Sequence, residues 1–186
     1  MKAKIIWICF ALLVLLQLWV PVSLVWSREQ ALTDGKTFIF KTAPVDPTDY
    51  LRGKYVTLNF SEQSIVLSGD HTWEQDEKIF VGLTTDAAGF ARIKRISNKK
   101  PSNGEDYVEA RAGYTNYETP KRLNIEWPFE RFYMEESKAP AAEQAYNRAG
   151  RDSAATAYAL VKVKKGVAVL ADVFINGKPI DEFIKE

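Results

Sequence analysis

Residues 157–174 read AYALVKVK-KG-VAVLADVF, and this stretch decides the fold class. Two runs rich in β-forming residues, 157–164 and 167–174, flank Lys165-Gly166. A two-residue connection that contains glycine is typical of a tight β-hairpin. We therefore predict two antiparallel strands here, with a second tight turn at Asn176-Gly177.

Similar short runs precede this hairpin. Residues 79–84 and 90–96 flank a turn segment that ends in Gly89, which predicts another hairpin. Residues 54–60 alternate, with Val56, Leu58 and Phe60 on one face. Further strand candidates are residues 37–41, 106–112 and 121–127. Many short strands separated by turns favour a mainly β fold, either a sandwich or a partly open barrel.

Residues 139–149 break the β pattern because they are rich in helix formers. Ala142, Ala145, Tyr146 and Ala149 fall on one side at helical spacing. Pro140 suits the first turn of a helix, and Gly150 suits its stop. We predict one short surface helix.

Residues 5–26 form an apolar run without charge, in which Gln17 and Ser23 are the clearly polar side chains. Twenty-two residues span roughly 33 Å as a helix, enough to cross the hydrocarbon core of a bilayer. Lys2 and Lys4 precede the run, which predicts a cytoplasmic N-terminus at residues 1–4 and an exported C-terminal side. We interpret residues 5–26 as a retained transmembrane signal-anchor, 27–36 as a linker, and 37–186 as an extracytoplasmic, periplasmic β domain.

A cleaved signal peptide is the competing interpretation of this run. Val25 and Ser27 could occupy positions −3 and −1 of a cleavage site, although no Ala-x-Ala follows. The single cysteine, Cys9, lies inside the apolar run, so the chain has no partner for an intramolecular disulfide.

The charge balance argues against nucleic acid and anionic lipid as main partners. The chain has 25 basic and 24 acidic residues, and Lys2 and Lys4 precede the anchor. The exported part therefore carries slightly more acidic than basic side chains and contains no basic patch.

The most distinctive polar stretch is residues 46–55, DPTDYLRGKY. Asp46, Asp49 and Arg52 could grip a partner or a polar ligand from an exposed loop, with Gly53 and Tyr55 opening the next strand. In the alternative interpretation the two carboxylates bond turn amides, Arg52 pairs with one of them, and Gly53 takes a special backbone angle.

Two further stretches are weaker candidates for chemistry. Asp70-His71-Thr72-Trp73-Glu74 holds the only histidine, but one His with two carboxylates is better interpreted as an exposed loop than as a metal site. Residues 126–136 combine aromatic and acidic side chains, which suit either paired-carboxylate hydrolysis or a core strand with ion pairs at its rim. From this stretch we take Trp127, Arg131, Tyr133 and Glu135 as candidate binding residues. We predict no catalytic residues, metal site or cofactor.

Residues 32–36 and 43–60 resemble the membrane-anchored bacterial GDYXXLXY proteins, which are named after their signature. The signature falls on residues 53–60, with Lys54 in place of the family's Asp and Phe60 in place of its final Tyr. Residues 126–135 and 161–179 are similar to the family's later segments. The resemblance implies an N-terminal membrane segment, an unknown function, and proximity to polytopic membrane proteins. Because Lys54 reverses a charge inside the signature, the signature is better interpreted as structural.

Three functions follow as hypotheses. The first is an interaction or accessory module that docks on a polytopic membrane protein through residues 46–52 or the aromatic surface 127–133. The second is a β domain that binds a small molecule or lipid in an apolar pocket. The third is a hydrolase with a β domain like that of signal peptidases, whose Ser and Lys motifs are not visible here.

Overall fold

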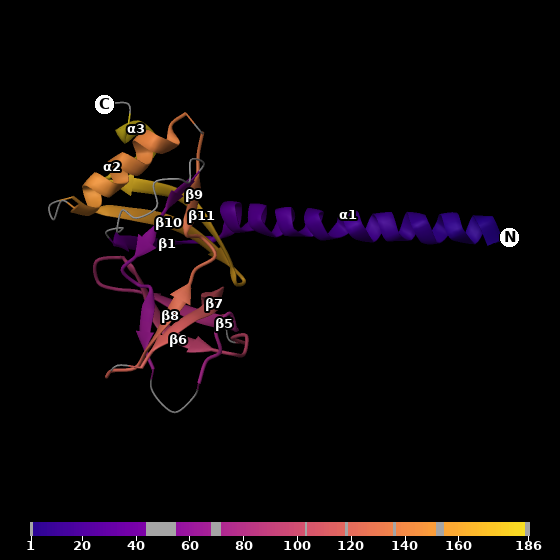
Figure 1. Cartoon of the computed structure of the whole chain (residues 1–186), viewed down its shortest axis with the longest axis horizontal. Helices are drawn as coiled ribbons and strands as arrows, with labels where there is room; N and C mark the ends of the chain where they lie inside the picture. Colours follow the sequence, from indigo (N-terminus) through magenta and orange to yellow (C-terminus); the bar gives the residue numbers. More distant parts are fainter. Residues whose placement is uncertain are drawn as a thin grey trace.

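The computed structural model describes residues 2–43, 55–67, 72–102, 104–117, 119–135, 137–151 and 155–184. A long helix projects from a domain built mainly of strands, with one short helix on the domain surface and a further single turn near its end (Figure 1). The predicted mainly β fold class is therefore confirmed.

Helix α1 runs without interruption from Lys2 to Asp34 and contains Pro21. It is long and apolar enough to cross a membrane, and its apolar side chains are exposed along its length. Residues 27–36, which we interpreted as a linker, are helical as far as Asp34. Ala31 near the end of the helix is completely buried against the domain, so the last turns of α1 are packed as well as folded.

The first sheet has five strands in the order β12-β11-β10-β1-β3. Its members are β1 (Lys36–Ala43), β3 (Asn59–Phe60), β10 (Ala157–Lys164), β11 (Val167–Ile175) and β12 (Lys178–Pro179). β10 and β11 form the predicted antiparallel hairpin. Lys165 and Gly166 at its turn have φ of 51° and 91°. These left-handed angles at both positions match the type I′ turns of two-residue hairpins.

The second sheet also has five strands, in the order β4-β8-β7-β5-β6. Its members are β4 (Ser64–Val66), β5 (Lys78–Thr85), β6 (Ala91–Ser97), β7 (Tyr107–Asn116) and β8 (Arg122–Glu126). β5 and β6 are the hairpin predicted around Gly89. Isolated bridges from Ile39 to Phe90 and from Val108 to Gly166 connect this sheet with the first.

Residues 54–60 were expected to form one strand, and in the described part of this stretch that expectation is wrong. β2 (Tyr55–Thr57) pairs with β9 (Arg131–Tyr133) in a small two-stranded sheet, whereas β3 pairs with β1. The chain changes partner at Leu58, whose amide donates to the carbonyl of Glu130 at 2.8 Å. Leu58 and Phe60 are nonetheless both buried on the core side, as their alternation predicted.

Helix α2 (Ala139–Arg151) covers one end of the domain together with the single turn α3 (Ile180–Phe183). The face predicted from helical spacing, Ala142, Ala145, Tyr146 and Ala149, is buried against the core. The expected stop at Gly150 is wrong by one residue, because the helix includes Gly150 and ends at Arg151. α2 lies on the side of the domain that faces away from the free end of α1 (Figure 1).

Candidate functional site

A groove of about 430 Å³ lies where α1 meets the domain, and we call it the juxtamembrane groove. Three separate segments of the chain, together with Glu109, form its walls: the last apolar turn of α1, the turn and strand around β9, and the first half of β11. Figure 1 shows β9 and β11 near the end of α1 that meets the domain. The lining residues are Leu24, Ser27, Arg28, Glu109, Pro128, Phe129, Arg131, Phe132, Tyr133, Gly166, Val167, Ala168, Val169, Leu170 and Ala171.

The β9 wall presents one aromatic and one cationic side chain. β9 pairs with β2 so that Tyr133 lies opposite Tyr55 and Arg131 opposite Thr57. Side chains alternate along a strand, so Arg131 and Tyr133 share one face while Phe132 between them packs against the core. The Tyr133 side chain is 66% exposed. The alternation of side chains along β9 therefore places the exposed Arg131 and Tyr133 side chains at the groove.

The β11 wall is apolar and lies at an edge of its sheet. Ala168 and Leu170 pack against the core, and Ala171 is the extra residue of a β-bulge opposite β10. β12 pairs with β11 only at Phe174 and Ile175. In the part of the chain that the structure describes, no strand pairs with the outer side of β11 between residues 167 and 173.

The α1 wall comes from Leu24, Ser27 and Arg28. The Ser27 hydroxyl donates to the Leu24 carbonyl at 2.8 Å, so it is satisfied within the helix. Arg28 is exposed at the rim. Glu109, the one carboxylate among the lining residues, is already paired with Lys78 at 2.7 Å. The groove thus joins an apolar strand edge to an aromatic ring and two guanidinium groups.

Four further residues of the predicted site fall outside the described residues. These are Asp46, Asp49, Arg52 and Gly53, and His71 of the weaker candidate stretch is also outside them. Tyr55 is described by its backbone, which places it beside Tyr133 in the two-stranded sheet. The structure therefore brings Tyr55, Arg131 and Tyr133 together from two stretches that lie far apart in the sequence.

Trp127 lies in the core and not on the surface. It is 4% exposed, and its indole N–H donates to the Glu62 carbonyl at 2.9 Å. Its ring contacts Phe40 and Phe129, and Phe60 completes this aromatic cluster. Phe129 also lines the groove, so Trp127 packs against the core side of one of the groove's residues.

The acidic residues near β9 have local structural partners. The Glu130 carboxylate accepts a hydrogen bond from the Trp127 amide at 3.2 Å. The pKa of Glu130 is raised above its usual value, mainly because the carboxylate is partly buried. Glu135 pairs with Lys138 at 2.8 Å before α2 begins, and this hydrogen bond lowers the pKa of Glu135. Glu135 is not among the residues that line the groove. Among the described residues no three His, Cys, Asp or Glu side chains converge as a metal site would require.

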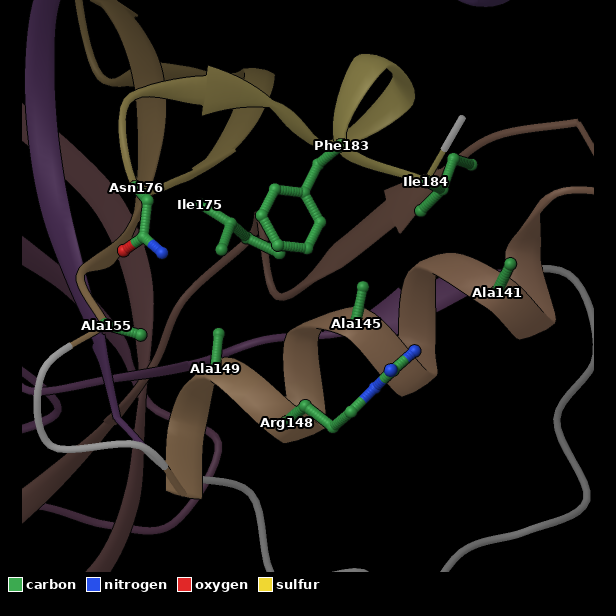
Figure 2. A pocket seen from close by; sticks show the side chains of 9 residues that line it. All are labelled: Ala141, Ala145, Arg148, Ala149, Ala155, Ile175, Asn176, Phe183 and Ile184. Atoms are coloured by element: carbon green, nitrogen blue, oxygen red, sulfur yellow. The ribbon is translucent and has the colours of Figure 1, made fainter. Parts of the chain in front are cut away.

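A second cavity, of about 390 Å³, lies between α2 and the end of the chain. Figure 2 shows Phe183 and Ile184 facing Ala145 and Ala149 across it, with the Arg148 side chain extended along α2 at its rim. We call it the α2–α3 cleft. It is mostly apolar and was not predicted, because its walls come from residues without any distinctive motif.

The comparisons with known proteins give one match. The sequence model of the family described as "GDYXXLXY protein" matches residues 17–173. No curated protein and no solved structure matches the chain. Every residue that lines the juxtamembrane groove lies within the matched region, whereas Ile175, Asn176, Phe183 and Ile184 of the α2–α3 cleft lie beyond it.

Proposed function

This chain belongs to the GDYXXLXY protein family, and we propose that it is a membrane-tethered interaction module whose juxtamembrane groove binds an exported segment of an integral membrane protein. In this proposal residues 5–26 stay in the bilayer as a single-pass anchor. Lys2 and Lys4 keep the N-terminus in the cytoplasm, and the β domain lies on the periplasmic side.

One observation carries the proposal: the anchor and the domain share the groove. Leu24 belongs to the apolar run that would end at the membrane surface, and it lines the same groove as Tyr133 and Val169. A segment emerging from the bilayer next to α1 would therefore meet the groove at once. A groove that bound a soluble partner would not need to include residues of the anchor helix.

The chemistry of the groove suits a polypeptide. Tyr and Arg are enriched at protein interfaces and among the residues that dominate their binding energy. The edge of β11 offers backbone groups to an extended segment, which is how many domains add a strand from a partner. Arg28 and Arg131 favour a partner segment that carries acidic side chains beside apolar ones.

The direct test is affinity purification of the full-length chain, tagged at its C-terminus, in mild detergent. We expect one integral membrane protein in near-equal amount, and its loss from the Arg131→Ala/Tyr133→Ala variant. The matched control is Arg148→Ala, which removes an exposed arginine from the far side of the domain and should retain the partner. Protease resistance of all three proteins checks that each is folded. Absence of any partner, also after mild cross-linking, would refute the proposal.

The orientation needs its own measurement. Alkaline phosphatase fused after the last residue should be active in a bacterial host, and a green fluorescent protein fusion at the same place should be dark. The reverse pattern would put the domain in the cytoplasm and contradict the proposal.

A small apolar ligand in the α2–α3 cleft is the second candidate function. Two features favour this function: the volume of the cleft lies within the range of small-molecule sites, and its lining is mostly apolar, as is typical of such sites. Mass spectrometry of the gently purified protein should then detect a bound molecule that is lost in the Phe183→Ala variant. A clean spectrum for the unaltered protein would leave the groove as the remaining site.

A further inference from the structure

Two polar side chains lie inside the apolar run of α1, and the structure treats them differently. The Ser23 hydroxyl donates to the Val20 carbonyl at 2.8 Å and is satisfied by its own helix. The Gln17 side chain is exposed on the helix surface, and among the described residues it has no hydrogen-bond partner. A carboxamide carries two donors and an acceptor, and lipid tails satisfy none of them.

Gln17 lies close to the middle of the span. The midpoint of residues 5–26 falls between Leu15 and Leu16, so Gln17 is about 2 Å from it along the helix axis. Snorkelling to the headgroups is an option for long side chains near the ends of a span, but Gln17 is too short and too deep for it. Polar side chains at such depth are typically satisfied by a neighbouring helix.

The direction of Gln17 around α1 matches the direction of the groove. At about 100° per residue, Leu24 and Arg28 lie within about 20° of Gln17 and Ala31 within about 40°. Leu24 and Arg28 line the groove, and Ala31 is the residue completely buried by the domain. α1 is one uninterrupted and nearly straight helix, so this face continues from the domain into the membrane (Figure 1).

We infer that α1 pairs through Gln17 with a membrane-embedded helix of a different protein, and that the chain following this helix enters the juxtamembrane groove. The inference rests on the proposed function and specifies its partner. That partner has a hydrogen-bonding side chain near mid-membrane, ends its helix at about the level of Leu24, and continues there as an extended segment.

A second copy of this chain does not fit the same face. Helices pack at interaxial distances of 8–10 Å. The α1 of a parallel second copy would continue as a straight helix to its own Asp34. On the Gln17 face it would then run into the domain, whose strands β10 and β11 contact α1 and which buries Ala31 on that side. A helix that stops at the membrane surface avoids this collision.

The test uses a photo-reactive amino acid placed in the full-length chain in living cells. One site is Leu13, about 40° from Gln17, and a control site is Leu15, about 160° away at similar depth. A third site is Ala171, exposed in the groove. We expect adducts with one and the same protein from Leu13 and Ala171, and none from Leu15.

Replacing the carboxamide then tests its role. Gln17→Leu should reduce the Leu13 adduct about 3- to 30-fold, the range implied by measured interhelical hydrogen bonds. Gln17→Leu/Leu15→Gln, which moves the carboxamide to the opposite face, should not restore it. Both variants should reach the membrane in unchanged amount.

The other outcomes separate this inference from the proposed function. An adduct from Ala171 alone would leave the groove as a binding site and overturn the helix pairing. An adduct of twice the mass of the chain would identify a second copy and overturn the inference. An unchanged Leu13 adduct in Gln17→Leu would overturn the role of the carboxamide. Absence of adducts from all three sites would refute both proposals.

Discussion

Replacing Phe60 by Ala tests whether the last position of the family signature anchors the core. Phe60 is 2% exposed. Its ring centroid lies 5.6 Å from that of Phe40 and 5.4 Å from that of Phe129, both in edge-to-face geometry. Removing a buried Phe costs about 3–5 kcal/mol, which includes about 0.5–1.5 kcal/mol for each such ring pair. Domains of this size are stable by about 5–15 kcal/mol, so the variant should lose a large fraction of its stability.

The assay is pulse proteolysis of the full-length protein in mild detergent across a urea series. At an m value of about 2 kcal/mol/M, a loss of 3–5 kcal/mol lowers the urea midpoint by about 1.5–2.5 M. The control is Tyr114→Ala, which removes an aromatic ring that is 66% exposed and should change stability by less than about 0.5 kcal/mol. If the two variants shift the midpoint equally, the aromatic cluster does not hold the domain together.

Three further predictions concern single groups. Burial raises the pKa of Tyr146 to about 12, so ionisation costs more in the folded than in the unfolded chain. Stability should be constant below pH of about 10 and fall by up to about 3 kcal/mol as the pH rises toward 12, and Tyr146→Phe should remove this slope in pulse proteolysis. Gly35→Ala would place a Cβ 2.1 Å from the Ala31 carbonyl oxygen, so it should lower stability by about 2 kcal/mol or more in the same assay. Tyr107→Phe removes a buried hydroxyl that has no partner among the described residues. The free energy of unfolding should therefore stay unchanged or rise by about 1 kcal/mol at most, measured from the urea midpoint. A clear fall of the midpoint would show that the hydroxyl has a hydrogen-bond partner.

Sequence periodicity and turn residues predicted the elements whose main contacts are with residues close to them in the sequence. The β10–β11 hairpin follows from two β-type runs around Lys165-Gly166, and the buried face of α2 follows from alanines at helical spacing. The helical extension to Asp34 also had a signal, because residues 28–32 are mostly good helix formers. Their polarity after the apolar run was interpreted as a linker instead.

The groove could not be predicted, because its α1 wall is about 100 residues or more from the β9 and β11 walls in the sequence. Trp127 and Tyr133 show the difficulty at the level of single residues. Both are aromatic side chains in one acidic and aromatic stretch, yet one is 4% and the other 66% exposed. Trp127 precedes a turn that folds it onto Phe40, whereas Tyr133 lies on the open face of a strand whose partner, β2, starts at Tyr55. That pairing across some 75 residues is invisible to periodicity.

In the proposed function, the junction between α1 and the domain determines where the groove lies relative to the membrane surface. The exposed ion pair between Lys164 and Asp34, at 2.8 Å, adds little by itself. Burial of Ala31 and the absence of a side chain at Gly35 do more, because any Cβ at Gly35 would meet the backbone of Ala31. Only Gly35 separates α1 from β1, and from Trp26 to Asp34 the helix rises about 12 Å. In the proposed function, this short helical connection sets the height of the groove beside the bilayer. If a partner segment emerges next to α1, as we propose, it meets a site whose walls are already assembled, and this lowers the entropic cost of binding.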